Sequence, residues 1–133
     1  MELIKLCALL GAAFSMGMGA VGAALGEGMI ALNVVKSLAR QPRAAGKLLR
    51  VMLIGQAITE TPAVFALVIS LLLIFQPSEG TFIKAVAFLI AGSAMGISTL
   101  ASGLGTSLPS KQACIEIGRQ PENVERLMLN MLV

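Results

Sequence analysis

The chain has 133 residues, of which 56% are hydrophobic and 13% are charged, with a mean hydropathy of +0.88. This composition indicates a membrane protein and excludes an ordinary soluble domain. A net charge of only +3 excludes a nucleic-acid partner, and the lack of His together with two isolated cysteines excludes a transition-metal site and a disulfide framework.

Residues 3–38 are predicted to form the first transmembrane helix, since about 20 apolar residues suffice to cross a bilayer. Its basic and apolar beginning is also typical of a signal peptide, but small and apolar residues continue well past the length of such a leader. Small residues let helix backbones approach closely in a membrane. We therefore expect helix contacts at a set of glycines in this segment, namely Gly17, Gly19, Gly22, Gly26 and Gly28.

Residues 39–44 are predicted to form a turn, because Pro42 lacks a backbone donor and pushes Gln41 out of the helical region. Five basic residues and no acid surround this turn: Lys36, Arg40, Arg43, Lys47 and Arg50. The next turn, around Pro77, carries no basic residue. The positive-inside rule then places the Arg40 loop in the cytoplasm and the Pro77 loop outside. Basic residues that only anchor a loop at lipid headgroups would give the same orientation.

Two further spans are predicted at residues 45–75 and 81–117, joined by an external linker at 76–80. A turn at 118–121 follows, and the last segment, 122–133, is too short to cross a bilayer. The sequence therefore predicts an all-α membrane protein that begins with an antiparallel transmembrane hairpin.

The second half of the chain repeats the first at an offset of 79 residues. The repeat includes the loop Arg40-Gln41-Pro42, which recurs as Arg119-Gln120-Pro121. Such self-similarity indicates duplication of one helical hairpin. We expect residues 1–75 to be a complete hairpin and residues 81–133 an incomplete second one, which stops short of the counterpart of Glu60.

Glu60 is the residue of the second span that most needs an explanation, because a carboxylate in a bilayer costs at least ~2.5–3.5 kcal/mol. Glu27 is the only other acid inside the first two predicted spans. In a hairpin that turns between Arg43 and Ala44, each lies about 16 residues, or ~25 Å, from the apex. Two carboxyls at one depth in a low-dielectric medium cannot both stay ionised, so we expect a proton or a metal cation to neutralise them.

Pro62 adds a further oxygen to this predicted site. It removes the helical hydrogen bond that would otherwise occupy the carbonyl of Ile58. With the Thr61 hydroxyl and the two carboxyls, this carbonyl makes an oxygen-rich cluster suited to a hard cation or hydronium. The alternative is a kinked helix with a permanently protonated glutamate pair, but intramembrane acids usually mark ion pathways.

A glycine-rich helix, an Ala-Arg-Gln-Pro loop and a Gly-Gln-Ala-x-x-Glu-Thr segment resemble the c subunit, or proteolipid, of rotary ATP synthases. The resemblance covers residues 3–75 closely and 81–133 as a diverged copy, similar to the duplicated proteolipids of vacuolar-type enzymes. It implies a homo-oligomeric ring in a bacterial-type cell membrane, in contact with lipid, a stator a subunit and a central stalk. It also implies that Glu60 carries the coupling ion and that Arg40, Gln41 and Pro42 contact the stalk.

The coupling ion is Na⁺ or H⁺, and neither a cofactor nor catalysis by this chain is expected. Sodium-binding members of the family carry Gln or Glu at the position of Glu27 and Ser or Thr at that of Thr61. Pro62 and Phe65 depart from the sodium pattern, so sodium is favoured only slightly. Two other functions stay open: a structural proteolipid that seals or fuses membranes, and a small channel or transporter unrelated to rotation.

Overall fold

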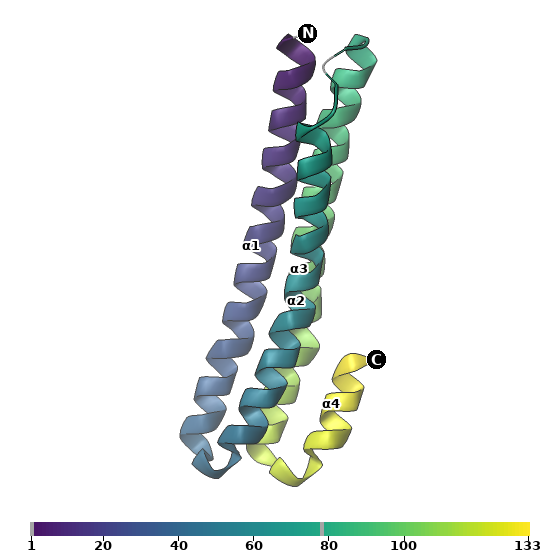
Figure 1. Cartoon of the computed structure of the whole chain (residues 1–133). Helices are drawn as coiled ribbons and strands as arrows, with labels where there is room; N and C mark the ends of the chain where they lie inside the picture. The colour runs from purple at the N-terminus through teal and green to yellow at the C-terminus, as the bar shows by residue number, and fades with distance from the viewer. Residues whose placement is uncertain (1, 78) are drawn as a thin grey trace. The chain divides into compact units, whose positions relative to one another are not determined.

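The computed structural model describes residues 2–77 and 79–133, so Met1 and Ser78 lie outside the described part of the chain. The elements follow in the order α1 (Glu2–Arg40), η1 (Pro42–Ala44), α2 (Ala45–Ile74), α3 (Phe82–Arg119), η2 (Pro121–Asn123) and α4 (Val124–Leu132) (Figure 1). The described residues contain no strand, which confirms the predicted all-α fold.

In the described part of the chain, three helices are long and apolar enough to cross a membrane, as predicted. The longest, α1, has 39 residues, or about 58 Å, against about 30 Å for the hydrocarbon core. These helices therefore continue into the headgroup region on length alone. By contrast, α4 has 9 residues and cannot span a bilayer.

The helix bounds differ from the prediction by one or two residues, most clearly at the two Arg-Gln-Pro loops. Gly118 and Arg119 were predicted to lie in a turn, but α3 includes both, and α1 likewise runs to Arg40. The reason is that a proline restricts only the residue before it. Gln41 alone leaves the helix, with φ −141° and ψ 78°.

The two Arg-Gln-Pro loops have the same backbone geometry, which carries the sequence repeat into the structure. Gln120 has φ −135° and ψ 78°, close to the values of Gln41. The N–H of Gln41 donates to the carbonyl of Ser37 at 2.9 Å, and the N–H of Gln120 donates to that of Glu116 at 2.7 Å. Both donors and both acceptors are 79 residues apart.

The contacts within the chain group into two compact units, each with parts of α1, α2 and α3. The first unit contains Met1–Ala23 and Thr61–Gly103, and the second contains Ala24–Glu60 and Leu104–Val133.

Most buried side chains of the first unit are small, although Ile4 and Leu73 are also buried, and most of its large apolar side chains are exposed. Ala8, Ala12 and Ala66 are buried, whereas exposed positions of the same unit carry large residues such as Leu6, Leu9, Phe14, Phe65, Leu67 and Leu72. This distribution suits helices surrounded by lipid, because lipid tails are as apolar as leucine and small residues allow close packing.

Two buried serines connect α1 to α2 in the first unit. The Ser15 hydroxyl donates to the carbonyl of Ala66 at 3.0 Å. The Ser70 hydroxyl lies within hydrogen-bond distance of two carbonyls, that of Ala12 on α1 at 2.9 Å and that of Ala66 on its own helix at 2.7 Å. Such interhelical hydrogen bonds stabilise packed helices in a membrane, by about 0.6 kcal/mol on average.

The second unit has a larger apolar core around the first turn of the chain. Its fully buried members are Ile30, Leu48, Val51, Cys114 and Ile117, from α1, α2 and α3, and Met131 of α4 packs against them. This core holds α1 and α2 together next to the first Arg-Gln-Pro loop.

Candidate functional site

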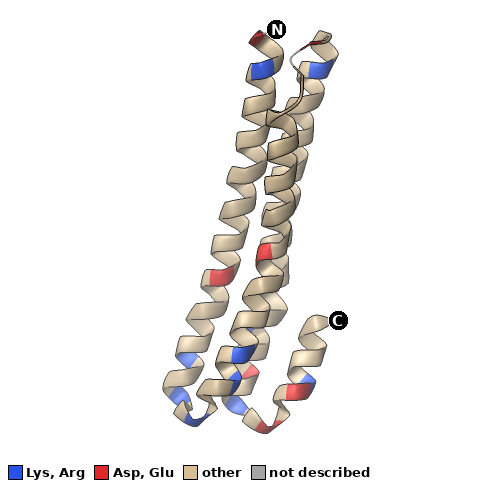
Figure 2. Ribbon diagram, in the orientation of Figure 1, with Lys and Arg blue, Asp and Glu red and all other residues tan. Residues whose placement is uncertain are grey.

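Glu27 and Glu60 interrupt stretches that are otherwise free of charge. Residues 6–35 contain no charged residue except Glu27, and residues 51–74 contain none except Glu60. Figure 2 shows the other charges gathered near the helix ends, with one acidic band part-way along α1 and one part-way along α2. In α3, residues 85–110 carry no charge at all.

The packing of α1 on α2 sets the levels of the two carboxyls. A Cβ added at Gly55 would lie 3.6 Å from Cδ1 of Ile30, so these residues face each other in the second unit. In antiparallel helices the residue opposite Glu27 is then Ile58, and Glu60 lies two residues, or about 3 Å, further along α2. The two glutamates therefore lie at similar levels on neighbouring helices.

The two glutamates differ in exposure within the chain. Glu27 is half-buried, and Glu60 is exposed. Thr59, the residue before Glu60, is fully buried, and its hydroxyl donates to the carbonyl of Gly55 at 2.8 Å. Because successive helical residues are about 100° apart, Glu60 lies beside the face that packs inside the chain. Its carboxyl is therefore available to a group outside the chain.

The other predicted ligands follow on the same helix. Pro62 lies inside α2 without ending it, so the Ile58 carbonyl lacks its usual helical donor. Thr61 is exposed next to Glu60, and Ile58 is half-buried. Among residues 2–77 and 79–133, no three His, Cys, Asp or Glu side chains form a metal-binding group. A sodium site of the predicted kind would use two carboxyls with a hydroxyl and a carbonyl.

The predicted packing glycines divide into two kinds within one chain. A Cβ at Gly19 would lie 2.8 Å from Cβ of Ala66, and one at Gly22 would lie 2.6 Å from Cα of Leu100. At Gly17 and Gly28, no described atom other than the nearby backbone of α1 itself lies within 4 Å of the corresponding point. Gly26 is buried. A role for the open positions between copies of the chain stays a prediction.

Glycines outside that predicted set make equally close contacts. Gly92 of α3 faces the backbone of Gly11, and Gly103 faces that of Gly22. The spacing of small residues along α3 signals a close contact, but it does not say which helix comes close.

The predicted stalk loop lies at the end of α1. Arg40 and Pro42 are exposed. The side-chain oxygen of Gln41 is buried and has no hydrogen-bond partner within the described residues. Sequence reasoning did not single out this unsatisfied amide.

Known proteins resemble this chain most clearly over its first hairpin. The sequence profile of the ATP synthase c-subunit family matches residues 10–73. The chain is similar to the ATP synthase c subunit numbered 2 of Cereibacter sphaeroides, with 47% identity over 74 residues, which are 56% of this chain and 89% of that protein. It is similar to the ATP synthase c subunit of Geobacter sulfurreducens, with 40% identity over 75 residues, covering 56% and 81%. A third relative, the c subunit from Petrotoga mobilis, is 43% identical over 67 residues, covering 50% and 70%.

Proposed function

Because this chain belongs to the family of ATP synthase c subunits, we propose that Glu60 binds and releases the coupling ion of the rotor. Members of the family form an oligomeric ring within the ATP synthase. They couple the flow of H⁺ or Na⁺ to the work of the synthase. The chain is thus a rotor-ring component and a multi-pass integral membrane protein. In this proposal, ion binding to Glu60 and its release drive rotation of the ring against a stator.

The observation that carries the proposal is the position of Glu60. It is the one charged residue of 51–74, and its carboxyl is exposed beside a helix face that is packed within the chain. An ionisable group at such a depth is costly and marks an ion pathway by default. Exposure toward a neighbouring copy or a stator would let the site open and close as the ring turns.

Glu27 is the proposed partner of Glu60 on α1. Glu27 is half-buried and lies at about the level of Glu60, so its carboxyl is proposed to share a proton with Glu60 or to help to hold a cation. The Ile58 carbonyl and the Thr61 hydroxyl complete the oxygen set. This set suits Na⁺ as a hard cation with oxygen ligands, and we propose Na⁺ ahead of H⁺.

The second copy carries Thr106 at the position of Glu27. We propose the same division as the repeat predicts. Residues 1–75 are the ion-carrying hairpin, 76–80 are an external linker, and 81–133 are a diverged copy of the hairpin.

The loop of Arg40, Gln41 and Pro42 is proposed to bind the central stalk on the cytoplasmic side. The stator a subunit would meet the Glu60 face of the ring, and lipid would cover the rest of it.

Carbodiimide labelling of purified rings tests the proposal, because the reagent attacks protonated carboxyls in an apolar site. Mass spectrometry should find the label at Glu60, and Na⁺ should slow labelling, since a bound cation lowers the population of the reactive form by mass action. Lowering the pH should weaken this protection, because protons compete for the same oxygens.

Glu60→Gln is the matched control and should abolish both the label and ion-coupled rotation. Labelling at a rate indifferent to Na⁺ over the whole pH range would contradict the sodium site and leave a proton carrier. Full rotation-coupled activity of Glu60→Gln would contradict the rotor role itself and favour a structural proteolipid.

A further inference from the structure

The two Arg-Gln-Pro loops have one backbone geometry but different side-chain surroundings. We call residues 36–44 the first loop and residues 115–123 the second loop. The first loop has three basic residues and no acid, whereas the second has one basic residue and two acids. A partner that binds through electrostatic complementarity would therefore distinguish the two loops.

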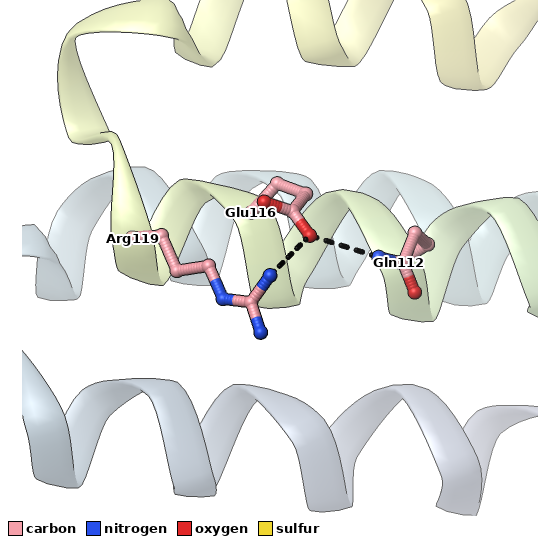
Figure 3. Close-up of polar contacts among 3 residues, drawn as sticks. All are labelled: Gln112, Glu116 and Arg119. Carbon is pink, nitrogen blue, oxygen red and sulfur yellow. Dashed lines mark hydrogen bonds and ion pairs between the residues drawn. The ribbon is translucent and has the colours of Figure 1, made fainter.

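The polar groups of the second loop are satisfied inside the chain. Nη1 of Arg119 contacts Oε1 of Glu116 at 3.1 Å, and Nε2 of Gln112 donates to the same oxygen at 2.9 Å (Figure 3). One turn further on, Nδ2 of Asn123 donates to Oε1 of Gln120 at 2.8 Å. Both the arginine and the glutamine of this loop thus have partners.

The first loop lacks both partners at the equivalent positions. Ser37 stands where the second loop has Glu116, and Ala44 stands where it has Asn123. As a result, Arg40 makes no ion pair within residues 2–77 and 79–133. In the same part of the chain, the buried Oε1 of Gln41 has no hydrogen-bond donor.

The packing of α1 against α3 explains why a small residue is required at position 37. Ser37 is 5% exposed, and a Cβ added at Gly118 would lie 2.6 Å from the Cβ of Ser37. A glutamate at this position would have no room, whereas the Glu116 side chain remains 30% exposed. The close helix contact at position 37 therefore leaves Arg40 without the acidic partner that Arg119 has.

We propose that the first loop alone docks on the central stalk, while the second loop does not take part. The partner surface would carry carboxylates for Arg40 and its basic neighbours Lys36 and Arg43. The acids of the second loop repel such a surface, and Arg119 is already paired. This inference rests on the proposed rotor function, and it gives one stalk-binding loop per chain instead of two.

The test compares the same substitution at two positions that share a backbone geometry. Rings of the full chain carrying Arg40→Gln or Arg119→Gln are titrated with the central-stalk complex of the same organism, at several salt concentrations. Arg40→Gln should raise the dissociation constant about tenfold or more at low salt and flatten its salt dependence, since charge-assisted hydrogen bonds are lost. Arg119→Gln should change it by less than about twofold, as expected of a charge outside the contact.

Two further variants keep the test decisive. Arg40→Lys keeps the charge, so it should keep most of the salt dependence even where Arg40→Gln rings fail to assemble. Glu116→Ser gives the second loop the residue of the first, so it should release Arg119 and tighten stalk binding.

The outcomes separate this inference from the rotor function. Equal losses for Arg40→Gln and Arg119→Gln, or a larger loss for Arg119→Gln, overturn the one-loop contact but leave the rotor function in place. A wild-type ring that does not bind the stalk at all overturns both.

Discussion

At the scale of single residues, the ion site depends on which oxygens surround Glu60. A carboxylate can hold a proton alone, but Na⁺ needs several oxygen ligands. Thr61 is the one proposed ligand that can be removed without touching a charge or the backbone. It therefore separates the two ions more cleanly than either glutamate does.

Thr61→Ala should raise the Na⁺ concentration needed to protect Glu60 by about three- to tenfold, in proportion to one lost ligand or hydrogen bond. The rate of carbodiimide labelling without Na⁺ should change little. Thr61→Ser keeps the hydroxyl and should behave as the wild type. If all three proteins show the same protection, the Thr61 hydroxyl is not a ligand.

Sequence alone predicts how far Glu60 lies from the proline turn along α2, but not its exposure. This distance follows from counting residues between Glu60 and the proline turn, because the rise per residue of a helix is fixed. Exposure depends on which face of α2 meets α1, and small residues occur all round this part of both helices. The buried oxygen of Gln41 was equally unpredictable, since burial of a side-chain atom depends on how the helices pack around the loop.

At the scale of helices, close packing in the first unit depends on α1 meeting α3 backbone to backbone. Gly22 lies against Leu100, and Gly103 lies against Gly22. Interiors packed to this density do not accept an added methyl without a shift. The cost of one such methyl can therefore be measured directly.

Gly22→Ala should destabilise the protein by about 1–3 kcal/mol, the usual range for overpacking, because the added Cβ would lie 2.6 Å from Cα of Leu100. Thermal unfolding of the ring in detergent measures this. Gly46→Ala, at the second residue of α2, is the control without overpacking, because no described atom beyond its neighbouring backbone lies within 4 Å of the added Cβ. In a helix interior, alanine is a better helix former than glycine by about 0.8–1 kcal/mol, so this gain partly offsets the cost of overpacking at Gly22. A Gly22→Ala ring as stable as the Gly46→Ala ring would mean that this contact is loose.

Helix number and helix ends were largely predictable, and helix partners were not. Apolar length determines a span, and a proline ends a helix at a nearby residue, so the bounds agree within one or two residues. The contacts of Ser15 and Ser70 with the neighbouring helix were missed. A serine in an apolar helix can equally bond to its own preceding turn, as Ser93 does.

At the scale of the whole molecule, the two ends of the spans differ in charge. The first loop and its flanks carry Lys36, Arg40, Arg43, Lys47 and Arg50, whereas the other end carries two basic residues, Lys5 and Lys84, and two acidic ones, Glu2 and Glu79. The Lys84 ammonium donates to the carbonyls of Pro77 at 2.8 Å and Glu79 at 2.9 Å. It therefore closes the linker between α2 and α3 and is only partly available to lipid headgroups.

The positive-inside rule then predicts that the first loop is cytoplasmic and the linker external, because short loops rich in Lys and Arg are retained on the cytoplasmic side. Single cysteines at Arg43 and Glu79, both exposed, test this in a background where Cys7 and Cys114 are replaced by Ala. An impermeant thiol reagent added outside intact cells should label Glu79→Cys and not Arg43→Cys. Inverted membrane vesicles should give the opposite result. Labelling of Arg43→Cys in intact cells would reverse the orientation, and the first loop could then not reach a stalk in the cytoplasm.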